Sequence, residues 1–128
     1  MTNKNKKRGS QKERSIVRTL GNEGYVAFRV CGSGGGTSNA RPDIVAFNHG
    51  YYYGIEVKSS EKDIIYIDKK QIRELALFCE SFNATPIVAV AFSGYPVNYL
   101  RIKELRCTDG GNYKVTRGML SKNNRILV

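Results

Sequence analysis

The sequence predicts an α/β fold in which a mixed β-sheet is flanked by helices, with the elements in the order αβββαβ. Two segments, 11–22 and 68–82, carry apolar residues at helical spacing. Short runs rich in β-branched and aromatic residues lie between and after them, at 25–31, 44–48, 51–58 and 86–92. The step from the third run through the second helix to the last run predicts a right-handed parallel crossover beside an antiparallel hairpin.

Length and charge restrict what this chain can do. Its 128 residues are enough for one core and not for two. It carries 21 Lys and Arg against 11 Asp and Glu, a formal net charge of +10. That excess favours a polyanionic partner such as nucleic acid, because neutralising phosphates releases counterions. No apolar run approaches about 18 residues, so neither a membrane span nor a membrane partner is expected.

The N-terminal residues are polar and basic, and we expect residues 1–8 to form a flexible arm ahead of a single domain at 9–128. They lack the apolar stretch of a signal peptide, so a cytoplasmic, nucleoid-associated protein is expected. The first helix should run from Gln11 to Asn22, with Ser10 as its N-cap and a buried stripe of Ile16, Val17 and Leu20.

The next two strands should pair as a hairpin around His49-Gly50. Symmetric pairing about that turn places Asp43 opposite Glu56, and strand alternation puts both on the same face as Lys58. Two directly opposed carboxylates repel each other, and a divalent cation would relieve that repulsion because Mg²⁺ prefers oxygen ligands. The alternative is an ordinary edge hairpin with solvated charges.

Several other features have two interpretations. Ser10-x-x-Glu13 fits a capping box, yet Glu13 borders the buried stripe, where a lone carboxylate is costly. Asp68 should cap the second helix, and Asp68-x-x-Gln71 fits a capping box too. The glycine-rich loop at 32–38 is either a linker or a mobile clamp that brings Ser33 to a phosphate.

The remaining segments carry weaker signals. The run at 86–92 is continuously apolar, which suits burial on both faces, and 95–102 should be an edge strand. From about Lys103 the chain is a weakly patterned extension, with a turn at 108–111 and a short helix expected at 117–125. The three cysteines form no CxxC pair and the chain has one histidine, so we expect core thiols rather than a zinc site.

These motifs together resemble a known family. Glu13, Arg41-Pro42-Asp43 and Glu56-Val57-Lys58 resemble the PD-(D/E)XK nuclease superfamily, whose fold is restriction-endonuclease-like. The surrounding residues point to one family within this superfamily. From about Arg8 to Phe92 the chain is similar to the Holliday junction resolvases of archaea and some of their viruses. The residues that point to this family are Arg8–Arg14, Phe28-Arg29-Val30 with Gly32-Ser33, Asp43–Ala46, Ile55–Lys58 and Gln71.

The resemblance implies an activity and a site. Such proteins are homodimers that require Mg²⁺ or Mn²⁺ and nick a four-way DNA junction symmetrically in opposed strands. The implied catalytic residues are Glu13, Asp43, Glu56, Lys58 and Ser33, and the first three of these would bind the metal. The expected DNA contacts come from Lys7, Arg8, Arg14, Arg29, Ser33 and Lys62, with Gln71 in a supporting role.

Two other functions stay open at this stage. One is a related nuclease that cuts flaps, mismatches or restriction sites. The other is an architectural DNA-binding protein, which needs the basic charge but has no use for an Asp/Glu/Lys cluster. Residues 114–128 show no clear match to a sliding-clamp binding box, which argues against coupling to the clamp.

Overall fold

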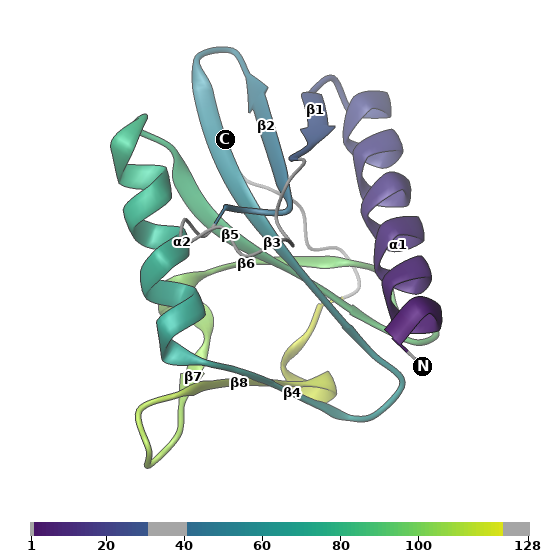
Figure 1. The fold of residues 1–128 in the computed structure, drawn as a ribbon, viewed down its shortest axis with the longest axis vertical. Coiled ribbons are helices and arrows are strands. Elements are labelled where there is room, and N and C mark those ends of the chain that lie inside the picture. The colour runs from purple at the N-terminus through teal and green to yellow at the C-terminus, as the bar shows by residue number, and fades with distance from the viewer. Residues whose placement is uncertain (1, 31–40, 122–128) are drawn as a thin grey trace.

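The computed structural model describes residues 2–30 and 41–121, with side chains from Gly9 onward, and it confirms the predicted α/β architecture (Figure 1). The main sheet has five strands in the order β1-β2-β3-β5-β6. Their bounds are β1 Val26–Arg29, β2 Ile44–Asn48, β3 Tyr51–Ser60, β5 Thr85–Phe92 and β6 Asn98–Arg101. Helix α1 (Thr2–Asn22) covers one face of this sheet, and α2 (Lys69–Ser81) covers the other.

The predicted hairpin and crossover are both present. Strands β2 and β3 pair antiparallel with Asn48 opposite Tyr51 and Ile44 opposite Ile55. His49 and Gly50 join them, both with positive φ (51° and 84°), as a two-residue primed turn requires. Strand β3 pairs parallel with β5 after the α2 crossover, and β6 closes that side of the sheet as an antiparallel edge strand.

The first helix begins earlier than expected. Residues 2–8 form the first turns of α1 rather than an arm, and Ser10 lies inside the helix instead of capping it. The Lys, Arg and Gln residues that flank Gly9 have good helix propensity, and one interior glycine costs only about 1 kcal/mol. The buried stripe is confirmed, since Ile16 and Leu20 are buried and Val17 packs against the same cluster.

Each face of the main sheet has its own core. On the α1 face, inward residues of the hairpin and of β5 pack with the α1 stripe, among them Ile44, Tyr53, Ile55 and Ile87. On the α2 face, the alternate residues Val88, Val90 and Phe92 pack with Ile72, Leu75 and Cys79. Strand β5 is therefore buried on both faces, as its continuous apolar run predicted.

A second sheet was not predicted. Strands β4 (Ile64–Ile67), β8 (Tyr113–Thr116) and β7 (Arg106–Cys107) form it in the order β4-β8-β7, so the weakly patterned extension belongs to the folded domain. Val115 of β8 is fully buried against the α2-side core. The expected helix at 117–125 is a single 3-10 turn, η2 (Arg117–Met119), like η1 (Ile102–Glu104), and residues 122–128 fall outside the described part.

Two smaller expectations have different outcomes. Cys79 is a core thiol as predicted, whereas Cys107 is exposed, because both residues of the two-residue strand β7 face solvent. Within the described residues, no helix is both long enough and apolar enough to cross a membrane.

Candidate active site

The candidate site forms where β2 stops pairing with β3. Asp43 immediately precedes β2, and its backbone N–H still donates to the Ile55 carbonyl at 2.9 Å. Beyond that point the Asp43 side chain replaces the backbone of β2 as the hydrogen-bond partner of β3, since the Val57 N–H donates to Asp43 Oδ2 at 2.8 Å. The Asp43 carboxylate is thus held at the edge of β3, and the register carries it opposite Glu56 as the sequence predicted.

Glu56 and Lys58 follow on β3 at alternate positions and so point to the same face. Lys58 Nζ lies 3.8 Å from Glu56 Oε2 and donates to Gln71 Oε1 of α2 at 3.0 Å. About a fifth of each side chain is exposed, 19% for Glu56 and 23% for Lys58, so the pair is reachable from solvent. Gln71 is thus a hydrogen-bond partner of Lys58, while Asp68 caps α2 by accepting from Lys70 N–H.

Glu13 reaches this region from α1 through an arginine. Arg29, the last residue of β1, donates from Nε to Glu13 Oε1 at 3.0 Å and from Nη2 to Ser10 Oγ at 3.1 Å. Both partners lie in the helix interior, so the capping-box interpretation of Ser10 and Glu13 is wrong. The bridge from Arg29 to Ser10 was missed, although the three-residue spacing of Ser10 and Glu13 places them on one helix face.

The pKa values of the Asp43 and Glu56 carboxylates are both raised above their ordinary values. Burial and, to a smaller extent, the nearby Asp43 charge raise the pKa of Glu56 to about 7, although Lys58 lowers it. Burial also raises the pKa of Asp43, against the lowering effect of the Val57 N–H, and the Glu13 charge adds to the increase. The pKa values of both neighbouring acids are raised in spite of the adjacent Lys58, and such perturbed groups are typical of functional sites.

A divalent cation fits this arrangement. In the described part of the chain no three acidic, His or Cys side chains stand close enough to enclose an ion by themselves. Mg²⁺ seldom needs that, because it usually takes one or two carboxylates and completes its shell with waters and substrate phosphates. Asp43 and Glu56 provide such a pair, and Glu13 is near enough for its charge to affect both.

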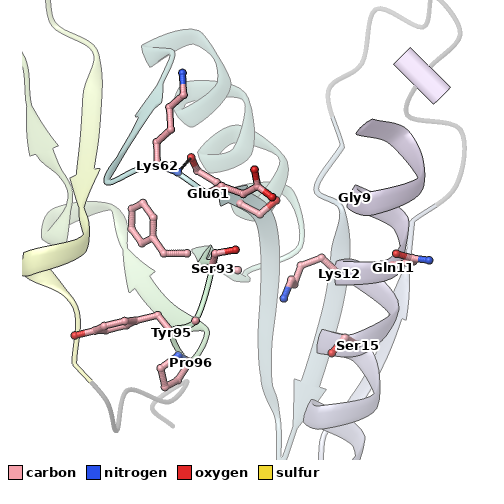
Figure 2. A pocket seen from close by; sticks show the side chains of 14 residues that line it. Gly9, Gln11, Lys12, Ser15, Glu61, Lys62, Ser93, Tyr95 and Pro96 are labelled. Atoms are coloured by element: carbon pink, nitrogen blue, oxygen red, sulfur yellow. Dashed lines mark hydrogen bonds between the residues drawn. The ribbon is translucent and has the colours of Figure 1, made fainter. Parts of the chain in front are cut away.

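The other predicted residues are less central. Arg14 is exposed on α1 beside Glu13, away from the buried stripe. Lys62 lies on the turn after β3, where it lines a cleft of ≈ 1190 Å³ that contains neither Asp43 nor Glu56 (Figure 2). Ser33 lies outside the described residues, as do the side chains of Lys7 and Arg8.

Comparison with known proteins identifies the family. The family described as archaeal Holliday junction resolvase (Hjc) matches residues 4–124. A crossover junction endodeoxyribonuclease Hjc of Sulfurisphaera tokodaii is 34% identical over 125 residues, covering 97% of this chain and 86% of the relative. A crossover junction endodeoxyribonuclease of Sulfolobus islandicus rod-shaped virus 1 is 36% identical over 92 residues, covering 70% of this chain and 75% of the relative.

A solved structure agrees with these sequence matches. The structure of Archaeoglobus fulgidus Hjc, a Holliday junction resolvase from an archaeal hyperthermophile, superposes with a TM-score of 0.79 at 28% identity. The similarity covers 86% of this chain and 89% of that one, so it extends far beyond the site alone. The chain belongs to the archaeal Holliday junction resolvase (Hjc) family.

Proposed function

We propose that this protein is a metal-dependent endodeoxyribonuclease that resolves four-way DNA junctions by paired nicks in opposed strands, during recombination and repair. Family membership supports the substrate class. The observation that carries the chemistry is the pairing of Asp43 with Glu56 beside Lys58, at the edge of β3 where β2 departs. A protein that only binds DNA has no use for two half-buried carboxylates held together beside a lysine.

Asp43 and Glu56 would hold Mg²⁺, for which Mn²⁺ can substitute, with Glu13 contributing directly or through water. A bound divalent cation polarises the scissile phosphate and lowers the pKa of its bound water. Glu13 is ion-paired with Arg29 through Oε1, and its other carboxylate oxygen, Oε2, would be the one offered to the metal or to a metal-bound water.

Lys58 would position the attacking water, since its ammonium projects between Glu56 and Gln71 on the same face as the metal pair. In-line displacement would then leave a 5′-phosphate and a 3′-hydroxyl. Arg29, with Arg14 and Ser33, would contact the scissile phosphate or the neighbouring DNA backbone, and Lys7, Arg8 and Lys62 would add positive charge along the bound arms.

Resolution needs two nicks on opposed strands, and one such site cuts one strand. We therefore propose a homodimer with two-fold symmetry, in which the fixed spacing of two basic faces selects a branched junction over linear duplex. No base-edge recognition is needed for that selectivity. Sedimentation at micromolar concentration tests it, and a monomer both with and without DNA would contradict the dimer.

The function is tested by incubating the pure protein with a labelled four-way junction, a flap, a mismatched duplex and a linear duplex, each in Mg²⁺ and in EDTA. We expect symmetric cutting of the junction alone, and only with metal. Preference for the flap or mismatch would indicate a nuclease with another target. Tight binding of every substrate without any cutting would indicate an architectural protein.

A further inference from the structure

Next to the carboxylate cluster lies a cleft that the chemistry above does not use. It is ≈ 1190 Å³ in volume and opens between the N-terminal half of α1, the end of β3 and the turn that joins β5 to β6 (Figure 2). Ser59 and Ser60 continue β3 directly after Lys58, so along the strand the cleft begins one residue, about 3.3 Å, beyond Lys58.

Two lysines, Lys12 and Lys62, line the cleft, and the ammonium of Lys62 points away from Lys12 and Ser93 (Figure 2). Lys58 is paired with Glu56 and Gln71, and Arg117 is paired with Asp63. Among the residues that the structure describes, the ammonium groups of Lys12 and Lys62 have no ion pair or hydrogen bond. Lys12 is half-buried and extends from α1 into the cleft toward Ser93, whereas its neighbour Gln11 points outward.

The rest of the lining suits a phosphate chain. Ser15, Ser59, Ser60 and Ser93 line the cleft together with Gly94. Hydroxyls and backbone N–H groups are common phosphate contacts in protein–DNA complexes, and they carry no sequence preference. Glu61 is the one carboxylate in the described lining, so the cleft keeps a net positive charge.

We infer that this cleft binds the phosphodiester backbone of the DNA strand that leaves the reaction centre, with Lys12 and Lys62 as its charged contacts. The inference rests on the proposed function for its ligand, because a strand held at Asp43 and Glu56 must continue somewhere within a few ångströms. Lys12 precedes Glu13 on α1 and Ser59 follows Lys58 on β3, so along both elements the cleft begins one residue from the site, although side chains alternate on β3 and that of Ser59 points to the opposite face from Lys58. Neither lysine is assigned a catalytic step.

Affinity for a labelled four-way junction, measured in EDTA at several salt concentrations, tests the cleft independently of cutting. Lys12→Ala and Lys62→Ala should each weaken binding by about 3- to 10-fold and reduce the salt slope by about one phosphate contact. Lys12→Arg should retain most of the affinity, and Glu61→Gln should tighten binding. Lys103→Ala is the matched control, because Lys103 is exposed on η1 outside the cleft, and it should change affinity less than twofold.

Single methylphosphonates placed at successive positions beside the nick then locate the contact. At one or two positions the neutral linkage should weaken wild-type binding but have no further effect in Lys12→Ala, which is the signature of a direct pair. Lysine variants that bind like Lys103→Ala, or losses that add at every position, would overturn the cleft assignment. That result is distinguishable from failure of the proposed function, in which wild-type protein binds the junction in EDTA but does not cut it in Mg²⁺.

Discussion

The two halves of β3 both pair with β5, but they differ in whether β2 pairs on the other side, in burial and in charge. Tyr51 and Tyr52 pair only with β2 and are exposed, whereas from Tyr53 to Ile55 the strand is paired on both sides, by β2 and β5, and is buried. From Glu56 to Ser60 only β5 remains, and the vacated edge is occupied by the Asp43 carboxylate on the Val57 N–H. Loss of a strand partner thus creates both an exposed edge and a place for charged side chains. The first half serves stability, and the second serves chemistry.

The largest effect is expected in the second half. Asp43→Asn, Glu56→Gln and Lys58→Ala should each reduce single-turnover junction cleavage by about 10³-fold or more, because each removes a group that acts on the reacting phosphate or its metal. Junction affinity in EDTA should stay within a few-fold of wild type, since it depends on distributed positive charge. Full activity in any one of the three variants would remove that residue from the site.

Glu56 should also lower stability when no metal is present. Its pKa rises from 4.5 to about 7 on folding, so the native state binds the proton more tightly than the unfolded chain does. The stability that protonation brings is complete below about pH 4.5 and is lost as pH rises through 7. In EDTA at pH 8, Glu56→Gln should therefore raise the free energy of unfolding by about 2 kcal/mol, and the gain should vanish near pH 4.5.

Denaturant unfolding at the two pH values measures this difference. Glu80→Gln, which removes an exposed carboxylate near the end of α2, should change the free energy of unfolding by less than about 0.5 kcal/mol at either pH. A Glu56→Gln protein that is less stable than wild type at pH 8 would show that this carboxylate is well solvated.

A substitution in the first half of β3 should lower stability and leave catalysis unchanged. A Cβ at Gly54 would lie 2.5 Å from Cys79 Sγ, which is itself buried under α2. Gly54→Ala should therefore cost about 1–3 kcal/mol of stability while cleavage per folded molecule stays unchanged. Adding Cys79→Ala should recover part of the loss in a double-mutant cycle, and strictly additive costs would mean that the two residues do not clash.

The smallest effect is expected outside β3. Gln71 contacts Lys58 and not the substrate, so Gln71→Ala should lower kcat about 10-fold with little change in affinity. As a positioning residue it should also alter the pH profile of cleavage, which a purely structural role in α2 would leave unchanged. Gln71→Glu keeps an acceptor for Lys58 and should retain more activity than Gln71→Ala.

The hairpin could be predicted from sequence because its register follows from a two-residue turn. Once His49-Gly50 is placed, every pair back to Asp43 and Glu56 is determined by counting. The second sheet could not be predicted in this way, since β4 pairs with β8, about 50 residues later in the chain, with no turn between them. For the same reason the Arg29 bridge from Glu13 to Ser10 required the packing of α1 on β1, which no local pattern specifies.

Metal binding by the Asp43 and Glu56 pair is tested most directly by titrating Mn²⁺ into the DNA-free protein at pH 8 and counting bound ions by electron paramagnetic resonance. We expect wild type to bind Mn²⁺, Asp43→Asn and Glu56→Gln to bind at least about 10-fold more weakly, and Lys103→Ala to match wild type. Equal Mn²⁺ affinity in wild type and in both carboxylate variants would contradict the assignment, because the edge of β3 would then not be the metal site.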